Sequence, residues 1–511
     1  MAAITPDSTT SAALAEKKKL QKSFRLSDMI FYTVATLLGL DTLGAVSSQG
    51  GQVLPWLIIS AITFLVPYAL LVSELGTTFP QEGGPYEWCK LAGGRFYAAL
   101  ASMLYWISNP LWLGGTLSVT AIAAIKSLWF NDPKFLLGGT KTSDAIIELG
   151  IALLFIWGTV YFAILSLRVG KWLCVFGSYI KLALLAVFVA LALVFFFGGH
   201  ATGKHLGVTD VLPTGDWGLI LSAILPVLIF NWVGFEVQNG ATEEMHDPQR
   251  DIPRSLLVAG SIAVIAYIVP IAIILFTLSK DQLSNASGFV QAFKVVSNAV
   301  PGPLGAALGW IIAIGVIISL ASSGGSWVIG ADRSYAVAAL DRAAHVILGR
   351  FSARYGTPIA VNIFSGVAAT IAMSVAILIN SFGTGSISAL FSIVLGFAIV
   401  TTTLSYLFIF PAFLILRYKY PDVERPYRAP GGVLGAWIIT ILTFGYAAIA
   451  SYYILIPSDS TVSSVGVSRF TYEATEFGAL AVILLLTVVF YVWGHREKRN
   501  KDVVNPASEI A

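Results

Sequence analysis

The sequence predicts an all-α integral membrane protein that crosses the bilayer twelve times. Of its 511 residues, 56% are hydrophobic and only 12% are charged, whereas a soluble domain carries about 25% charged residues. Apolar stretches of membrane-spanning length recur along the whole chain, and the first and the sixth are interrupted by glycine and polar residues. A chain with so few charges would expose too much apolar surface in water, so lipid is the solvent that fits it.

A bilayer core requires about 20 apolar residues per helix. No long hydrophilic insertion separates the stretches that reach this length, which predicts one membrane domain over residues 28–494. The third, eighth and tenth stretches are longer than the bilayer is thick, so we expect them to tilt or to extend beyond it. The twelve stretches are 28–49, 53–75, 95–125, 144–167, 171–197, 217–239, 255–278, 304–336, 358–380, 386–416, 432–456 and 474–494.

The distribution of Lys and Arg predicts the orientation. Residues 1–27 and 495–511 are polar and basic, and the first of these has no apolar core of a signal peptide. With both tails in the cytosol, only seven of the 31 Lys and Arg residues fall in external segments. The protein is therefore expected in a plasma or inner membrane. The seven are Lys126, Lys134, Lys141, Lys204, Lys280, Lys294 and Arg469.

Composition and motifs argue against several functions. A net charge of +3 gives no broad basic surface for nucleic acid. The histidines lie in loops or tails without metal-site spacing, and the two cysteines suggest no disulfide framework. No glycine-rich phosphate loop followed by Lys and Ser or Thr is present. The loops are also too short for a catalytic domain, so we expect no enzyme, no cofactor and no metal site. One sequon, Asn285-Ala286-Ser287, would be a glycan acceptor only in a eukaryotic secretory route.

Helices 1 and 6 are interrupted at matching places. Helix 1 reads ATLLGLDTLGAVSS over residues 35–48, and helix 6 reads LIFNWVGFEVQNG over residues 228–240. An unwound stretch frees backbone groups that lipid cannot satisfy, and paired interruptions of this kind point to a transporter's binding site. The alternative is that the glycines only permit close helix packing. The residues predicted to bind substrate here are Gly39, Leu40, Asp41, Thr42, Gly44, Phe230, Asn231, Trp232 and Gly234.

Helix 3 carries a second polar patch at bilayer depth, formed by Tyr105, Trp106, Asn109 and Pro110. Tyr105 and Asn109 are predicted to line the substrate pathway. Alternatively, the patch only marks the kink that a proline causes.

Three segments carry a resemblance to a known family. They are ELGTTFPQEGGPYEW (74–88), GFEVQNGATEEMHDPQRDIPRSLL (234–257) and GADRSYAVAALDR (330–342). They resemble, in the same order, the amino acid–polyamine–organocation transporters. The resemblance implies a LeuT-like fold of two inverted five-helix repeats, 28–197 and 217–416, with two further helices in 432–494. It also implies alternating access around a central site, and transport of amino acids, amines or polyamines driven by protons or by exchange for a counter-solute.

The resemblance assigns roles to single residues. In the family, a Gly-Ser-Gly segment of helix 1 holds the substrate carboxylate, and here Gly39, Leu40 and Asp41 stand at that place. Phe230 occupies the position of the gating aromatic, although Trp232 could serve instead.

For both of these aromatic residues, core packing is the alternative. Glu236 occupies the position of an acid linked to protonation, and its alternative role is to cap freed amides. The external segment 126–143 lacks the cysteine through which relatives join a heavy subunit, so that partner is not expected.

Asp41 bears most directly on the substrate. A carboxylate at mid-membrane costs about 2.5–3.5 kcal/mol on insertion scales, a cost that normally marks function. If Asp41 lines the site, it repels a substrate carboxylate about 4 Å away by roughly 4 kcal/mol at an effective dielectric constant near 20. An amine without a carboxylate would instead be attracted. Two alternatives remain: Asp41 carries the coupling proton, or it pairs with Lys181.

Lys181 stands deep in helix 5, where sodium-independent relatives place a lysine instead of sodium. It is predicted to act as a sodium mimic or as a proton acceptor, the alternative being a lysine that snorkels to the interface. Helix 8 carries Ser319, Ser322, Ser323 and Ser326. Of these, Ser322 and Ser323 are predicted to solvate the ammonium, although serines also serve simply in packing.

These observations favour a sodium-independent secondary transporter of amino acids or related amines. A dedicated carrier of decarboxylated amines or polyamines and a sodium-coupled symporter are the alternatives. A channel would not need two broken helices around one pocket, and a membrane enzyme would need a catalytic cluster.

Overall fold

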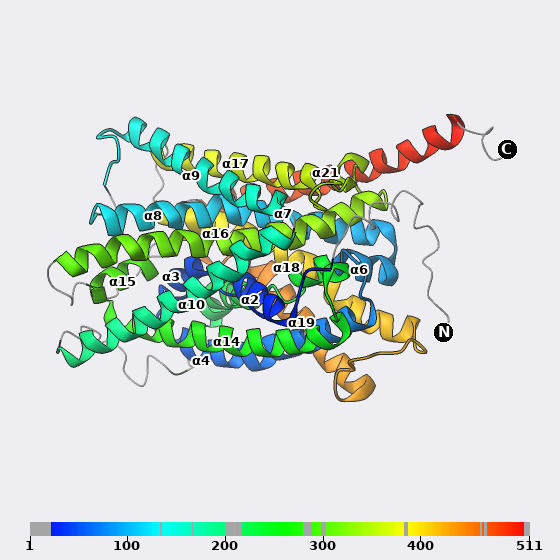
Figure 1. Cartoon of the computed structure of the whole chain (residues 1–511), viewed down its shortest axis with the longest axis horizontal. Helices are drawn as coiled ribbons and strands as arrows, with labels where there is room; N and C mark the ends of the chain where they lie inside the picture. Colours follow the sequence, from blue (N-terminus) through cyan, green and yellow to red (C-terminus); the bar gives the residue numbers. More distant parts are fainter. Residues whose placement is uncertain are drawn as a thin grey trace.

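The computed structural model describes residues 22–132, 135–165, 167–199, 212, 217–278, 288–297, 303–382, 387–459, 462–463 and 468–504. The predicted sequon at Asn285, the outer parts of both tails and part of the external loops lie outside these ranges. Within them the chain is helical and forms no strand, and Figure 1 shows long helices running side by side along one axis of the molecule.

Twelve helical spans in the described residues are long and apolar enough to cross a membrane, as predicted. The first six, here helices 1 to 6, are α2 (Leu26–Leu37) with α3 (Leu40–Ser47); α4 (Val53–Ser60), η1 (Ala61–Leu65) and α5 (Val66–Thr78); α7 (Arg95–Trp112), η2 (Leu113–Leu117) and α8 (Ser118–Trp129); α9 (Lys141–Ile164); α10 (Leu167–Phe197); and α12 (Trp217–Leu219), η3 (Ile220–Ile224), α13 (Leu225–Trp232) and η4 (Val237–Glu244). Helices 7 to 12 are α14 (Pro248–Thr277), α16 (Pro303–Leu340), α17 (Ile359–Phe382), α18 (Ile387–Lys419), α19 (Gly432–Leu455) and α21 (Arg469–Val504).

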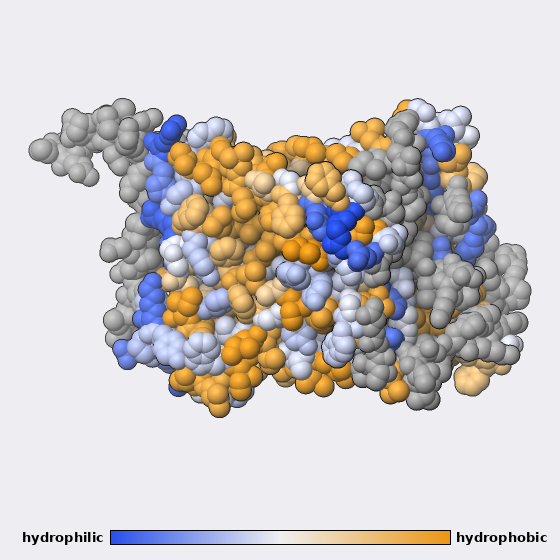
Figure 2. Space-filling view, turned by 180° about the vertical axis from the view of Figure 1, so that it is seen from behind, coloured by the Kyte–Doolittle hydropathy of each residue, from blue (hydrophilic) through white to orange (hydrophobic). Residues whose placement is uncertain are grey.

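Helix 1 lies in the middle of the bundle, with α10 and α14 packed against it (Figure 1). In helix 1, 89% of the residues in the apolar stretch are buried inside the protein. In helix 12, only 17% of the corresponding residues are buried. The outer surface is correspondingly apolar, and Figure 2 shows a broad hydrophobic region across the middle of the molecule. Exposed leucine, isoleucine and tryptophan side chains of this kind are stable against lipid chains rather than water.

In the part of the chain that the structure describes, three spans contain a π-helical turn, in η1, η2 and η3. Such a turn inserts an extra residue and changes the direction in which the following side chains point. In η2, a Cβ atom on Gly114 would collide with the backbone of Ala369 in α17. Glycine is therefore needed where helix 3 crosses helix 9.

Among the described residues, two short α-helices lie between the spans and were not predicted: α6 (Pro85–Gly93) and α15 (Gly288–Ser297). A Cβ atom on Gly288 would lie 2.9 Å from the Cα atom of Gly44. Gly44 thus provides the close contact between α3 and α15.

The start of helix 1 lies beside the end of helix 6. Phe24 and Met245 form an isolated β-bridge, and the amide of Phe24 donates to the carbonyl oxygen of Glu244 at 3.0 Å. The two interrupted helices are therefore tied to each other at this end.

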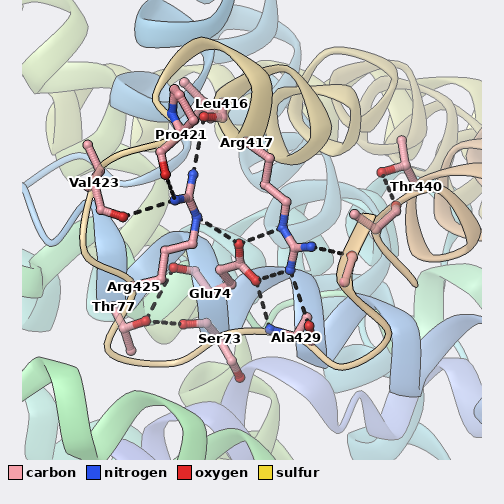
Figure 3. Close-up of polar contacts among 12 residues, drawn as sticks. Ser73, Glu74, Thr77, Leu416, Arg417, Pro421, Val423, Arg425, Ala429 and Thr440 are labelled. Atoms are coloured by element: carbon pink, nitrogen blue, oxygen red, sulfur yellow. Dashed lines mark hydrogen bonds and ion pairs between the residues drawn. The ribbon is translucent and has the colours of Figure 1, made fainter. Parts of the chain in front are cut away.

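Glu74, the first residue of one family motif, holds helix 2 to helix 10 (Figure 3). Its carboxylate accepts from Nε and Nη2 of Arg417 at 2.8 and 2.5 Å. It also pairs with Nε of Arg425 at 3.2 Å and accepts from the amide of Ala429 at 2.7 Å. Because the carboxylate is buried, these bonds fix the loop between α18 and α19 against the end of α5.

Candidate functional site

Helices 1 and 6 are both broken, as predicted. Leu38 and Gly39 have extended backbone angles between α2 and α3. Val233 is extended after α13, and Gly234 has a φ of 128°, which only glycine adopts without strain. That the interruptions fall in the first and the sixth span is what a five-helix repeat predicts; the inverted repeat itself remains a prediction.

Tyrosine side chains satisfy part of the freed backbone. The amide of Gly39 donates to the hydroxyl of Tyr267 at 2.9 Å, and that hydroxyl donates to the carbonyl oxygen of Leu37 at 2.8 Å. Across the bundle, the amide of Gly234 donates to the hydroxyl of Tyr68 at 3.2 Å. The protein itself therefore stabilises both breaks, and not every freed group is open to a ligand.

Lys181 is completely buried against the break in helix 1 and does not snorkel. Its ammonium donates to the carbonyl oxygens of Leu38 at 2.5 Å and Ala35 at 3.3 Å. These carbonyls belong to the last turn of α2, where the helix dipole favours a positive charge. Ser323 accepts a third bond at 2.7 Å. The other predicted serine, Ser322, donates instead to the carbonyl oxygen of Cys174.

Asp41 lies in the first turn of α3 and is 1% exposed. Its Oδ2 atom accepts from the indole of Trp112 at 2.8 Å and from the hydroxyl of Thr116 at 3.1 Å. Its Oδ1 atom is buried without a hydrogen-bond partner. The structure describes both Asp41 and Lys181 and shows no ion pair between them. Each side chain is instead hydrogen-bonded to other groups.

A small cavity lies between the two breaks. Its volume is about 10 Å³, enough for about one water molecule. Four residues predicted to bind substrate line it, namely Gly39, Thr42, Phe230 and Asn231. Its other lining residues are Thr36, Leu37, Trp112, Val233, Tyr267 and Trp327. The cavity is thus too small to hold more than about one water molecule.

The remaining predicted binding residues lie outside this lining. They are Leu40, Asp41, Gly44, Tyr105, Asn109, Trp232 and Gly234. The indole of Trp232 donates to the hydroxyl of Ser60 at 2.8 Å, so this ring turns toward helix 2. Phe230, two residues earlier, is the aromatic residue of helix 6 that faces the cavity.

Aromatic residues of helices 3, 6, 7 and 8 line the cavity. The ring of Trp112 meets those of Phe230 and Trp327 edge to face, with centroids 5.8 and 6.2 Å apart. Tyr105 packs on Trp327 at 5.8 Å. Sequence reasoning missed Trp112, although it lies one turn from Asn109. It also missed Trp327, which stands directly after the last helix 8 serine, and Tyr267, for which no signal existed.

Several buried polar groups on these helices have no hydrogen-bond partner. Besides Oδ1 of Asp41 they include both side-chain polar atoms of Asn109 and of Asn231, and the hydroxyl of Tyr105. Glu236 accepts from the hydroxyl of Tyr406 at 2.7 Å through one oxygen, while the other has no partner. Buried polar groups are nearly always satisfied in stable cores, so these atoms are candidates for contact with water or a ligand.

A buried charge cluster closes the bundle on the side of the chain termini. Arg333 of α16 pairs with Glu244 of η4 at 2.5 Å and with Glu82 at 3.4 Å. Burial, together with the nearby Glu244 carboxylate, raises the pKa of Glu82 well above its usual value. The cluster joins helix 8, the end of helix 6 and the segment before α6.

A helical bundle with twelve membrane-length spans and a small polar site between two broken helices defines a multi-pass membrane transporter. The chain belongs to the amino acid permease family, whose sequence profile matches residues 24–490. This confirms the predicted membership of the amino acid–polyamine–organocation superfamily, and the protein is a transporter rather than an enzyme.

Three relatives illustrate the range of the family. A probable agmatine/putrescine antiporter of Lactococcus lactis is 28% identical, over 85% of this chain and 89% of its own. A glutamate/gamma-aminobutyrate antiporter of the same species is 21% identical, over 88% and 86% of the two chains. A polyamine transporter of Arabidopsis thaliana is 26% identical, over 75% and 70%.

Proposed function

We propose that this protein is a sodium-independent secondary transporter of a small organic cation, either a decarboxylated amine or a polyamine. Asp41 is the observation that carries the proposal. It places a carboxylate at the break in helix 1, where one of its oxygens has no partner in the protein. The relatives named as agmatine/putrescine and polyamine transporters support the same substrate class.

The charge of Asp41 discriminates between an amine and the amino acid from which it derives. Two like charges about 4 Å apart repel by roughly 4 kcal/mol at an effective dielectric constant near 20, and opposite charges attract by a similar amount. Trp112 and Thr116 donate to the other carboxylate oxygen and so hold the side chain in place. The α-carboxylate of an amino acid would therefore be rejected, and an ammonium would be bound.

The aromatic rings around the cavity favour a cationic substrate as well. A cation over the face of an aromatic ring is stabilised by about 0.5–1 kcal/mol at an exposed site and by about 2 kcal/mol where water is excluded. Trp112, Phe230 and Trp327 line the cavity, and their side chains are buried. Phe230 is proposed to move aside when the substrate enters.

The ammonium of Lys181 occupies the place where a sodium-coupled transporter would bind a sodium ion. Its ammonium holds the carbonyl oxygens of Ala35 and Leu38 at the end of α2. Sodium would need these same oxygens as ligands. A fixed ammonium there makes sodium unnecessary, so we propose that transport is driven by exchange or by protons, with Glu236 as a second protonatable group.

Alternating access is proposed to proceed by opening the cavity toward one side of the membrane at a time. The cavity of about 10 Å³ is too small for any amine, so the described conformation is a closed one. We place the protein in a plasma or inner membrane with both termini in the cytosol, as the distribution of Lys and Arg predicts.

The proposal is tested by uptake into proteoliposomes with paired substrates. Agmatine is compared with arginine, and putrescine with ornithine, because each pair differs by one carboxylate. Uptake is measured with and without sodium, with a pH gradient, and with unlabelled amine inside. We expect saturable uptake of the amines, stimulation by internal amine or by the pH gradient, and no effect of sodium. Uptake of the amino acids alone, or an absolute need for sodium, would contradict the proposal.

A further inference from the structure

A second concave site lies on the lipid-facing surface, away from the central cavity. It has a volume of about 470 Å³ and is formed by η1 and α5 of helix 2 on one side and α14 of helix 7 on the other. Apolar side chains such as Ile62, Val66 and Leu257 form its walls, and they are 64%, 52% and 72% exposed. The groove is therefore open toward the membrane.

The groove is about as long as one leaflet of the bilayer. Its lining extends from Ala61 to Ser73 along helix 2 and from Pro253 to Val264 along helix 7. These stretches contain thirteen and twelve residues, and at 1.5 Å per residue they span roughly 17 Å, about half of a hydrocarbon core of roughly 30 Å. It lies at the end of α14 that follows the Phe24–Met245 bridge. The predicted orientation makes this the cytosolic leaflet.

One end of the groove is polar. Arg254 and Tyr427 line it there, together with Ser73 at the end of α5. Arg254 forms no ion pair with any described residue, although Asp251 lies on the preceding turn of α14 and interacts with its charge. Tyr427 belongs to the loop that Glu74 holds in place through Arg417 and Arg425 (Figure 3). The loop that carries Tyr427 is thus held in place, and the Arg254 guanidinium lies beside it at the level of the lipid headgroups.

We propose that the groove binds one anionic phospholipid of the cytosolic leaflet. An acyl chain would lie between helices 2 and 7, and the lipid phosphate would contact Arg254. A guanidinium binds phosphate through paired N–H donors, and basic sites beside membrane helices recruit anionic headgroups. The apolar length of one leaflet and a single cation at its end match one lipid molecule.

Binding at this site would reach the interrupted helix. The buried ring of Phe235 lines the groove and directly follows Gly234 at the break of helix 6. A Cβ atom on Gly260 would lie 3.0 Å from this ring, so α14 packs closely on it. A lipid chain in the groove would contact both, which links its occupancy to the position of helix 6.

Native mass spectrometry tests the proposal with two lipids of identical chains, phosphatidylglycerol and phosphatidylcholine. The full chain is purified in detergent, and bound lipid is counted at equal concentrations of each. We expect one preferred phosphatidylglycerol. Arg254→Gln should weaken its binding about fivefold, since one basic side chain near the surface contributes ~1 kcal/mol. The matched control Arg250→Gln removes an exposed charge on the same helix and should have no effect.

A second pair of variants tests the groove itself. Ser261→Trp places a bulky ring in the lining, whereas Ile265→Trp adds the same ring one turn further along α14, outside the lining. Only Ser261→Trp should abolish the preferred lipid, and thermal unfolding confirms that both variants fold. Equal binding of the two lipids, an equal loss in Arg250→Gln and Arg254→Gln, or a lipid retained by Ser261→Trp would each overturn the proposal.

Discussion

The Nζ atom of Lys181 in helix 5 lies 2.5 Å from the carbonyl oxygen of Leu38, the residue at which helix 1 breaks. The same carbonyl also accepts from the hydroxyl of Ser323 in helix 8. Three helices therefore meet at one unwound peptide group. The ammonium neutralises the negative end of α2, so the break depends on this charge.

Lys181→Met should abolish transport and lower stability. The variant keeps an unbranched apolar stem but leaves the carbonyl oxygen of Ala35 without its side-chain donor and that of Leu38 with only the hydroxyl of Ser323. A bond to a charged group contributes about 1.5–3 kcal/mol. We expect uptake to fall more than tenfold and the unfolding temperature in detergent to drop.

Ser322→Ala is the matched control, because Ser322 bonds the carbonyl oxygen of Cys174 rather than Lys181. It should leave uptake nearly unchanged, while Ser323→Ala should reduce it moderately. Normal uptake by Lys181→Met would show that the ammonium is not needed at the break.

Asp41→Asn should weaken the binding of a cationic amine. Asparagine preserves an oxygen for Trp112 and Thr116 but removes the charge. We expect the half-saturation concentration for agmatine or putrescine to rise at least tenfold, part of the roughly 4 kcal/mol available to a close pair of opposite charges. Asp41→Gly should go further and shift the preference toward arginine or ornithine.

The outcome of these two variants separates the roles open to Asp41. Thr116→Val serves as the control, because it removes one donor to the carboxylate and keeps the charge. If neither Asp41 variant changes the ratio of amine to amino acid uptake, while the pH dependence is lost, Asp41 carries a proton rather than reading the amine.

Gly234→Ala should destabilise the protein and stop transport. At a φ of 128°, a residue with a Cβ atom is strained by about 1–3 kcal/mol. The added methyl group would also lie 3.2 Å from Cβ of Thr36 in helix 1. Both effects act at the break of helix 6.

The control for this variant is Gly158→Ala, at a position in α9 where a Cβ atom meets nothing within 4 Å. It should keep the unfolding temperature and uptake of the wild type. Unfolding temperatures are measured for both variants in the same detergent. An equal result for the two would mean that the break tolerates ordinary backbone angles.

Hydropathy was enough to predict the twelve spans, since each must present about 20 apolar residues to lipid whatever it packs against. Glycine next to polar residues located both breaks for a similar reason: such runs cannot remain regular in lipid. What could not be predicted was which aromatic residue faces the cavity. Phe230 and Trp232 are two residues apart, and the π-turn η3 earlier in the same helix shifts the phase of the side chains.

The wall residues Trp112, Tyr267 and Trp327 were missed because aromatic side chains are equally at home in lipid, in a core and around a ligand. Only the structure shows that Trp112 bonds Asp41 and that Tyr267 bridges Leu37 and Gly39. The partner of Lys181 is a similar case. A charged residue predicts a charged partner, but an unwound helix end offers backbone carbonyls that composition does not reveal.

Glu74→Gln should destabilise the end of the bundle at which the loop between α18 and α19 lies. Glu74 is 2% exposed and neutralises Arg417 and Arg425 together, so its loss leaves two guanidinium groups partly buried without a counter-ion. Breaking a buried pair in this way typically costs about 3–5 kcal/mol. We expect a lower unfolding temperature and faster cleavage by trypsin in the segment 420–431. Because the carboxylate is shielded from solvent, wild-type stability should change little between low and high salt.

Arg428→Gln, which removes an exposed charge from the same loop, is the matched control and should behave like the wild type. If Glu74→Gln resists trypsin as the wild type does, the loop is held by contacts other than this carboxylate.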